Sequence, residues 1–293
     1  MKIVFFGTSD FAVPALEALA KNGYEISAVV TAPDKPAGRK RILAPSPIKV
    51  AAQKLGCEIF QPTSLKKDGK FFEKFRSLNP EMAVVVAYGK IIPGKYLSIP
   101  KYGFINVHPS LLPKYRGPTP IQSALLNGDK ETAVTIMVVD EEMDHGPILV
   151  QEKYDIWSKT TYTELHDELA DIGAELLIKT IPDFVSGKTK PREQAHDQAT
   201  FVKLYEREDG KLDWSLTPQE IYNRIRALNP EPGTWTTWKG KVLNIKKAAL
   251  NLPTQAGERG QLEPLVVQLE GGKEMPIYTF LNGHPDFKLE DCQ

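Results

Sequence analysis

Asn106 and His108 are two side chains whose types and spacing could do chemistry. They lie at the end of a short apolar segment, and side chains two residues apart in an extended chain point to the same side. Pro109 follows at once, and because proline cannot continue a central strand, the chain must leave the sheet there. Both side chains could therefore meet a reacting carbonyl group beyond the strand end. The alternative, that they are buried polar residues satisfied by neighbouring backbone, fits these two residues alone equally well.

The sequence predicts an α/β fold around this pair. Residues 2–6 form an apolar strand typical of one covered on both faces, residues 11–20 have a helical pattern, and residues 26–31 form a second strand. Strand, helix and strand in this order make a βαβ unit, which implies a right-handed parallel crossover. Further apolar strands are expected over residues 82–87 and 133–140. We therefore predict a Rossmann-like, mostly parallel sheet with flanking helices.

Polar residues and glycines concentrate where the predicted strands end. In an open parallel sheet, ligands bind beyond the carboxyl ends of the strands. The segments at those ends hold Gly7, Asp34, Tyr88, Gly89, Asn106, His108 and Asp144. Gly7 is followed by Thr8 and Ser9 rather than by the dinucleotide-binding pattern G-x-G-x-x-G, so we do not predict NAD binding. This edge of the sheet nevertheless has the composition of a ligand site.

Length and composition indicate a globular chain of two domains. The chain has 293 residues, of which 41% are hydrophobic and 25% are charged. It has no apolar run near the roughly 20 residues that cross a membrane, and it enters its first strand without a signal-peptide cleavage site. Cys57 and Cys292 form no disulfide or metal motif, so we expect a cytoplasmic protein. The formal net charge of zero gives no general attraction to nucleic acid, which would have to bind at local patches.

The two domains are expected over residues 1–188 and 209–293, with a linker over residues 189–208. The linker is assigned because this segment is polar and only weakly periodic. The second domain contains β segments separated by turns, among them a hairpin around Lys239-Gly240 and an extended segment over residues 276–280. We expect this domain to be a smaller, OB-like β-barrel.

These segments together resemble the 10-formyltetrahydrofolate-dependent formyltransferase family over nearly the whole chain. The most specific match is Asn106-x-His108-Pro109-Ser110-Leu111-Leu112-Pro113 together with Asp144. Further matching segments are residues 6–12, 45–49, 85–89, 135–137, 144–146, 210–215 and 225–230, and Gly283. The resemblance implies that 10-formyltetrahydrofolate donates a formyl group to an amine, and that the first domain is catalytic. The less specific second half implies that the acceptor is the α-amine of initiator methionyl-tRNA, and that the second domain binds tRNA.

The resemblance assigns catalysis to Asn106, His108 and Asp144, and these residue types suit formyl transfer. Attack of an amine on the formyl carbon produces a tetrahedral oxyanion. An asparagine N–H and a protonated histidine are suitable donors to that oxyanion, each worth roughly 3 kcal/mol in a dry site. A carboxylate beside the histidine favours its protonated form and orients the ring. Because a free α-amine is partly protonated at neutral pH, Asp144 is also a candidate to relay the amine proton.

The same resemblance implies which residues bind the formyl donor. They are Ser110, Leu111, Leu112 and Pro113, the turn Tyr88-Gly89, and Asp140 and Glu142 in the loop over residues 140–146. The turn and the loop are expected to hold the pterin ring through backbone contacts. No metal is expected, because the five histidines show no paired ligand spacing and the reaction needs no Lewis acid.

Three basic residues, Arg39, Lys40 and Arg41, lie in a proline-containing loop. A cluster of this kind is most often a solvated surface, but here it matches the family's basic insertion that grips the tRNA acceptor end, through phosphates rather than bases. Three features depart from the family pattern. Pro109 replaces the glycine of some relatives, His145 stands where many relatives have threonine, and acidic residues slightly outnumber basic ones from Glu208 on. We expect a monomer whose partners are the folate and the tRNA, with no membrane.

Two other functions stay open from the sequence alone. A sugar-nucleotide N-formyltransferase would use the same donor and the same three catalytic residues, although the basic loop and the segment over residues 213–230 favour tRNA. A non-catalytic folate- or nucleotide-binding module would need neither Asn106 nor Asp144 for its biological effect. Comparing charged initiator tRNA with amino-sugar nucleotides as acceptors separates the two transferases.

Overall fold

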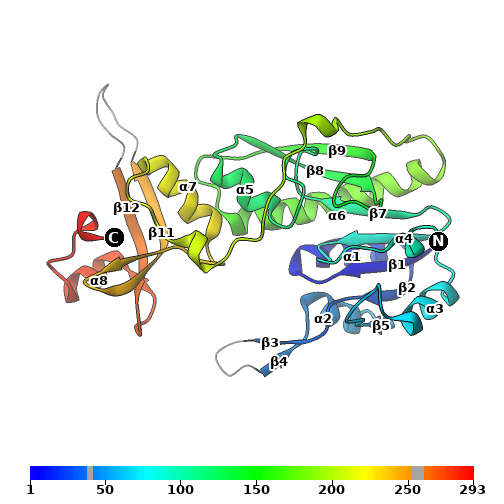
Figure 1. Cartoon of the computed structure of the whole chain (residues 1–293), viewed down its shortest axis with the longest axis horizontal. Helices are drawn as coiled ribbons and strands as arrows, with labels where there is room; N and C mark the ends of the chain where they lie inside the picture. The colour runs from blue at the N-terminus through cyan, green and yellow to red at the C-terminus, as the bar shows by residue number, and fades with distance from the viewer. Residues whose placement is uncertain (38–41, 252–260) are drawn as a thin grey trace. The chain divides into compact units, whose positions relative to one another are not determined.

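The computed structural model describes residues 1–37, 42–251 and 261–293 (Figure 1). These residues form two compact units, each built from separate stretches of the chain. The first unit comprises Met1–Pro118, Thr132–Tyr154 and His166–Phe201, and the second comprises Thr119–Glu131, Asp155–Leu165 and Val202–Gln293. The first unit therefore extends into the predicted linker, with residues 189–201 in the first unit and residues 202–208 in the second.

Within the described residues, the first unit is built on a seven-stranded sheet with the order β5-β2-β1-β6-β7-β8-β9. The strands are β1 (Lys2–Gly7), β2 (Glu25–Val30), β5 (Ile59–Phe60), β6 (Met82–Val86), β7 (Phe104–His108), β8 (Glu131–Val138) and β9 (Ile148–Asp155). The pairs from β5 to β7 are parallel, and β8 joins β7 antiparallel. Along the chain, β2 and β5 are added to the sheet on one side of β1, and β6 to β9 are then added on its other side. The strand order therefore reverses between β1 and β6. The predicted Rossmann-like sheet is confirmed, and ligands bind at such a reversal.

Helices flank this sheet, and some of them begin at residues whose side chains cap them. They are η1 (Asp10–Ala12), α1 (Val13–Lys21), α2 (Pro47–Lys54), α3 (Gly69–Ser77), α4 (Gly94–Leu97) and α6 (Tyr162–Val185). The Ser46 hydroxyl accepts a hydrogen bond from the backbone N–H of Lys49 at 3.1 Å, which caps α2. Asp68 caps α3 by accepting from the backbone N–H of Phe71 at 2.9 Å. Among the residues described, no helix has the length and apolar composition needed to span a membrane.

An aromatic core holds β1 and β7 in place. The ring of Phe6 contacts the rings of Phe75 and Phe104, whose centroids lie 5.9 and 5.5 Å away. All three side chains are buried, and each such burial stabilises the fold by about 2–3 kcal/mol. Phe104 begins β7, so this core anchors the strand that ends in Asn106 and His108.

Gly7 ends β1 where there is no room for a side chain. A Cβ atom at this position would lie 3.0 Å from the Cβ of Ala12 and 3.1 Å from the carbonyl oxygen of Val86. A glycine is therefore needed for the end of β1 to pack against η1 and β6. Close packing alone explains this glycine, and it requires no bound dinucleotide.

In the part of the chain that the structure describes, the second unit has a four-stranded antiparallel sheet with the order β10-β11-β12-β13. The strands are β10 (Trp235–Trp238), β11 (Lys241–Asn251), β12 (Gln261–Leu269) and β13 (Met275–Pro276). Lys239 and Gly240 have φ angles of 48° and 72°, the combination of a tight hairpin turn, as predicted. The small β-rich second domain is confirmed, and its closure into an OB-like barrel stays a prediction.

The extended segment expected over residues 276–280 is wrong. Helix α8 (Ile277–Gly283) starts there instead. Ile277 and Phe280 are spaced as on one face of a helix, but so short a pattern does not separate helix from strand in a sequence. The ring of Phe280 is buried, with its centroid 5.7 Å from that of Trp238 in β10, and this packing favours the helix.

Arg226 in α7 (Pro218–Leu228) ties early parts of the chain to the second unit. Arg226 is 6% exposed, and its guanidinium donates to the carbonyl oxygens of Thr160 at 2.9 Å and of Leu125 at 3.3 Å. Leu125 lies in α5 (Pro120–Leu126). Two stretches that precede α7 by many residues therefore belong with the C-terminal part of the chain rather than with their sequence neighbours.

We expect Arg226→Met to lower the free energy of unfolding of the second unit by roughly 3 kcal/mol, because it leaves buried carbonyl oxygens without donors. Urea unfolding followed by tryptophan fluorescence measures this change, since Trp157, Trp214, Trp235 and Trp238 all lie in that unit. The matched control is Arg224→Met, which removes a half-buried arginine two residues away in the same helix and should cost less than about 1 kcal/mol. Equal losses in the two variants would contradict the role of Arg226.

Candidate active site

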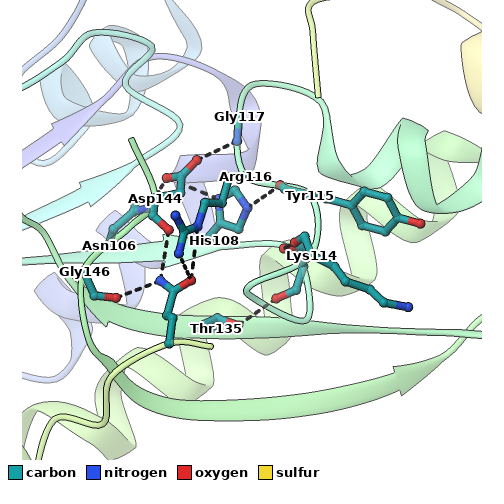
Figure 2. A network of polar contacts seen from close by, with 11 residues as sticks. Asn106, His108, Lys114, Tyr115, Arg116, Gly117, Thr135, Asp144 and Gly146 are labelled. Carbon is teal, nitrogen blue, oxygen red and sulfur yellow. Dashed lines mark hydrogen bonds and ion pairs between the residues drawn. The ribbon is translucent and has the colours of Figure 1, made fainter. Parts of the chain in front are cut away.

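Asn106 and His108 at the end of β7 meet Asp144 from the loop after β8 (Figure 2). The Oδ1 atom of Asp144 lies 3.4 Å from Nδ2 of Asn106, a weak hydrogen bond, and 3.6 Å from Nδ1 of His108. Its Oδ2 atom accepts a hydrogen bond from the backbone N–H of Gly117 at 2.8 Å. An amide and an imidazole thus face one carboxylate oxygen, close enough for a single substrate group to touch all three side chains.

The neighbours of His108 decide where its protons sit. Nε2 lies 3.0 Å from the carbonyl oxygen of Tyr115, and because a carbonyl only accepts, Nε2 carries a proton. Nδ1 faces the Asp144 carboxylate. At 3.6 Å this contact is too long for a hydrogen bond, and it is an ion pair only when the ring is protonated on both nitrogens. His108 is 4% exposed, so water does not replace these partners.

Two residues with left-handed backbone conformations surround His108. Tyr115 has a φ of 62° and Asp144 a φ of 50°. For residues other than glycine this region costs roughly 1 kcal/mol or more, and such strain persists only where the surroundings enforce it. Tyr115 presents its carbonyl oxygen to the imidazole, and Asp144 presents its carboxylate. The two strained residues are therefore the ones that orient the His108 ring.

The segment after β7 is held by its own hydrogen bonds. The buried hydroxyl of Ser110 donates to the carbonyl oxygen of Lys114 at 2.6 Å. Gln151 donates to the carbonyl oxygen of Leu112 at 3.0 Å, and the side chain of Leu112 is buried. The side chains of Ser110 and Leu112 therefore shape the loop, while the half-buried Leu111 and Pro113 are better placed to contact a ligand.

The turn Tyr88-Gly89 follows β6, beside the point where the strand order reverses. The Thr8 hydroxyl donates to the carbonyl oxygen of Tyr88 at 3.1 Å, which ties the ends of β1 and β6 together. The Tyr88 ring is buried, and this burial raises the pKa of its hydroxyl, which stays protonated. Since the ring belongs to the core, the turn presents backbone, as the prediction of backbone contacts to the donor requires.

Asp140 and Glu142 differ in their surroundings. Asp140 Oδ2 lies 2.6 Å from Nδ1 of His145, and Oδ1 accepts from the backbone N–H of Glu142 at 3.0 Å. The side chain of Glu142 is exposed. Asp140 thus stabilises the loop itself. Although carboxylates gather here, residues 1–37, 42–251 and 261–293 contain no group of three or more histidines, cysteines or carboxylates arranged to hold a metal ion.

The predicted tRNA-binding residues Arg39, Lys40 and Arg41 lie outside the described residues. The strands on either side, β3 (Lys35–Ala37) and β4 (Ile42–Ala44), pair antiparallel. Asp34 directly precedes β3 and forms an ion pair with Lys49 at 2.7 Å. Hydrogen bonds from Lys49 and Gln61 lower the pKa of the Asp34 carboxyl. Asp34, which the sequence placed at the ligand edge, therefore anchors the base of this hairpin.

Sequence reasoning missed Gln194, the hydrogen-bond partner of Arg116. Both side chains are buried, and Arg116 donates to the Gln194 side-chain oxygen at 2.8 and 3.2 Å. Gln194 in turn donates to the carbonyl oxygens of Asp144 at 2.9 Å and of Gly146 at 2.7 Å. Gln194 lies in the segment predicted as a linker, and no local periodicity marks it, so no sequence signal could have found it.

Comparison with known proteins decides the family. Residues 1–181 match the family model described as formyl transferase, and residues 205–263 match that of the formyl transferase C-terminal domain. A methionyl-tRNA formyltransferase of Chloroflexus aurantiacus is 46% identical over 273 residues, which cover 91% of this chain and 88% of that one. The chain belongs to the formyl transferase family. A methionyl-tRNA formyltransferase of Caldanaerobacter subterraneus is 41% identical over 301 residues and 97% of each chain.

Solved structures confirm the formyl transferase fold. The N-formyltransferase of Helicobacter canadensis, solved with folinic acid and dTDP-3-aminofucose, superposes with a TM-score of 0.69. It covers 94% of this chain and 98% of its own, at 19% sequence identity. The family predicted from the sequence is therefore confirmed, and the chain is a formyl-transferring enzyme.

We expect Gly146→Ala to lower the free energy of unfolding by about 1–3 kcal/mol, because its Cβ atom would lie 2.0 Å from the carbonyl oxygen of Val138. Amide hydrogen exchange should also become faster over residues 140–146, since the loop must shift. Gly283→Ala serves as the control, because its Cβ atom would meet no neighbour within 4 Å. If Gly146→Ala had wild-type stability and wild-type exchange, the loop would accommodate a side chain at this position, and the prediction would be wrong.

Proposed function

We propose that this enzyme transfers a formyl group from 10-formyltetrahydrofolate to the α-amine of initiator methionyl-tRNA. The observation that carries the proposal is the convergence of Asn106 and His108 on Asp144 in a chain 41–46% identical to methionyl-tRNA formyltransferases. The enzyme acts as a monomer in the cytoplasm and uses no metal. The folate is a co-substrate that gives up one carbon.

The reaction passes through a tetrahedral intermediate. The deprotonated amine forms a bond to the formyl carbon, and the formyl oxygen becomes an oxyanion. Asn106 has a second N–H besides the one directed to Asp144, and it donates to the oxyanion together with Nδ1–H of the His108 imidazolium, which at 3.6 Å makes no hydrogen bond to Asp144. Each donor lowers the barrier by about 3–4 kcal/mol because it is fixed before the reaction begins.

Asp144 accepts the proton of the attacking amine and passes it on. Its Oδ2 atom is held by the Gly117 N–H, while Oδ1 faces the two donors and the reacting carbon. The carboxylate takes a proton from the attacking amine, and that proton reaches the folate nitrogen as the bond from carbon to folate breaks. Atoms and charge balance: one carbon–nitrogen bond forms, another breaks, and the proton moves from the acceptor to the carrier.

The folate lies along the strand ends next to these three residues. The Tyr88-Gly89 turn and the loop over residues 140–146 bind its pterin ring through backbone groups, and Asp140 holds that loop through His145. Leu111 and Pro113 contact the donor with half-buried apolar surface, on a loop shaped by Ser110 and Leu112. Glu142 is exposed and contributes at the rim.

Transfer of labelled formyl from 10-formyltetrahydrofolate to charged initiator methionyl-tRNA tests this function. We expect transfer to methionyl-tRNA and none to amino-sugar nucleotides. In Asn106→Ala and Asp144→Asn, kcat should fall about 10²- to 10⁴-fold, because one loses an oxyanion donor and the other the proton acceptor. The Asp171→Asn control, which changes an exposed carboxylate on α6, should keep wild-type kinetics.

Three outcomes would defeat the proposal in different ways. Preference for an amino-sugar nucleotide would keep the chemistry but change the acceptor. Full activity in Asp144→Asn would remove the proton role that the geometry supports, and folate binding without any transfer would indicate a binding module.

The basic residues Arg39, Lys40 and Arg41 grip the acceptor end of the tRNA through its phosphates in this proposal. Replacing all three by alanine should raise KM for the tRNA and flatten its dependence on salt, because up to three phosphate contacts and their released counterions are lost. Kinetics with saturating tRNA should keep kcat within a few-fold of wild type. The control replaces Lys66, Lys67 and Lys70 by alanine, which removes the same charge elsewhere on the first unit. Equal effects of both triple variants would contradict a specific role for this loop.

A further inference from the structure

The loop that carries Asp144 is fastened to a segment far along the chain. Gln194 is 5% exposed, and its amide nitrogen donates to the carbonyl oxygens of Asp144 and Gly146 at 2.9 and 2.7 Å. A single side chain thus holds both carbonyl groups that flank His145. Asp144 and Gly146 are two positions of the loop where the backbone has little freedom.

The partners of Gln194 fix which way its amide points. Arg116 donates to the oxygen end at 2.8 and 3.2 Å, since a guanidinium has only donors. The nitrogen end must then face the two carbonyls, which only accept. The positive charge of Arg116, which is 3% exposed, polarises the amide and strengthens the hydrogen bonds that it donates on its other side.

Asp144 needs such a restraint. Its φ of 50° is a conformation that an aspartate leaves readily unless its neighbours enforce it. Gly146 has no space for a side chain against Val138, which fixes one side of the loop. The hydrogen bond from Gln194 to the carbonyl oxygen of Asp144 acts on the strained residue itself, and so on the direction in which its carboxylate points.

Arg116 reaches the other end of the loop by a second route. It donates to Nδ1 of His196 at 2.8 Å, and the His196 ring stacks on that of His145, with centroids 4.1 Å apart and planes 9° apart. Nδ1 of His145 lies 2.6 Å from Asp140. One buried guanidinium thus supports the loop near its start, through two stacked rings, and near its end, through Gln194.

We propose that Gln194, oriented by Arg116, is a positioning residue that holds Asp144 in the strained conformation needed to face Asn106 and His108. It touches no reacting atom. The inference rests on the proposed formyl transfer for its effect on rate, and on the geometry alone for its effect on the loop. Through Gln194, the segment over residues 193–198 would contribute to catalysis by positioning Asp144.

Two substitutions separate positioning from simple packing. Gln194→Met fills a similar volume and removes both halves of the contact. Gln194→Glu keeps an acceptor for Arg116 but presents a carboxylate, which cannot donate, to the carbonyls of Asp144 and Gly146. The matched control is Gln198→Met, the same change at an exposed position of the same segment.

In the full-length chain we expect both Gln194 variants to lower kcat for formyl transfer about 10- to 100-fold, with KM for the tRNA within three-fold of wild type. Amide hydrogen exchange over residues 140–146 should be faster in both, while exchange in β1 and β6 stays as in wild type. Gln198→Met should match wild type in every measurement.

Each other outcome counts against the proposal. Wild-type kcat in Gln194→Glu would show that donation to the loop is not needed. Should Gln194→Met fail to fold, Gln194→Glu still decides, and failure of both to fold would make the contact structural only. If the wild-type chain transfers no formyl group, the proposed function fails, whereas the exchange data still test whether Gln194 holds the loop.

Discussion

A carboxylate oxygen shared between an amide and an imidazole is the interaction on which the first unit depends. The Asp144 side chain is 15% exposed, so its charge has lost most of its water and needs fixed partners. Asn106, His108 and the Gly117 N–H supply them from β7 and the turn that follows. The arrangement is stable only if the loop after β8 and the turn after β7 keep their positions relative to each other. Many of the contacts described above hold these two segments in place.

The sheet fixes Asn106 and His108, whereas backbone strain lies in the two loops that approach them. β7 is paired on both sides, and the aromatic core anchors it at Phe104, so Asn106 and His108 have little freedom. The two loops that approach them are bent at Tyr115 and Asp144, each with positive φ, and each directs an oxygen atom at the imidazole. Strain at these positions is compatible with folding because separate hydrogen bonds restrain both loops.

Local patterns predicted the strands, the hairpin at Lys239-Gly240 and the family, because an apolar run or a turn pair acts within a few residues. The convergence of Asn106, His108 and Asp144 was expected from strand ends that share an edge. In the structure β8 runs antiparallel to β7 and ends beside the start of β7, and the loop after β8 brings Asp144 back to His108. Contacts made across long stretches of chain were not predictable. Gln194, in a segment without periodicity, and Arg226, in helix α7, are single buried polar residues. Their importance lies only in carbonyl groups that folding brings to them.

Chemistry and acceptor recognition in this enzyme depend on different electrostatics. The interactions around Asp144 are largely shielded from water, so ions in solution barely screen them. A neutral chain, by contrast, exerts no long-range pull on a tRNA, and exposed cations must attract it within a Debye length of about 8 Å. Salt therefore acts on encounter with the tRNA and leaves the chemical step largely unchanged. Changes in surface charge can therefore alter selectivity for the acceptor without disturbing the strained loop that carries Asp144.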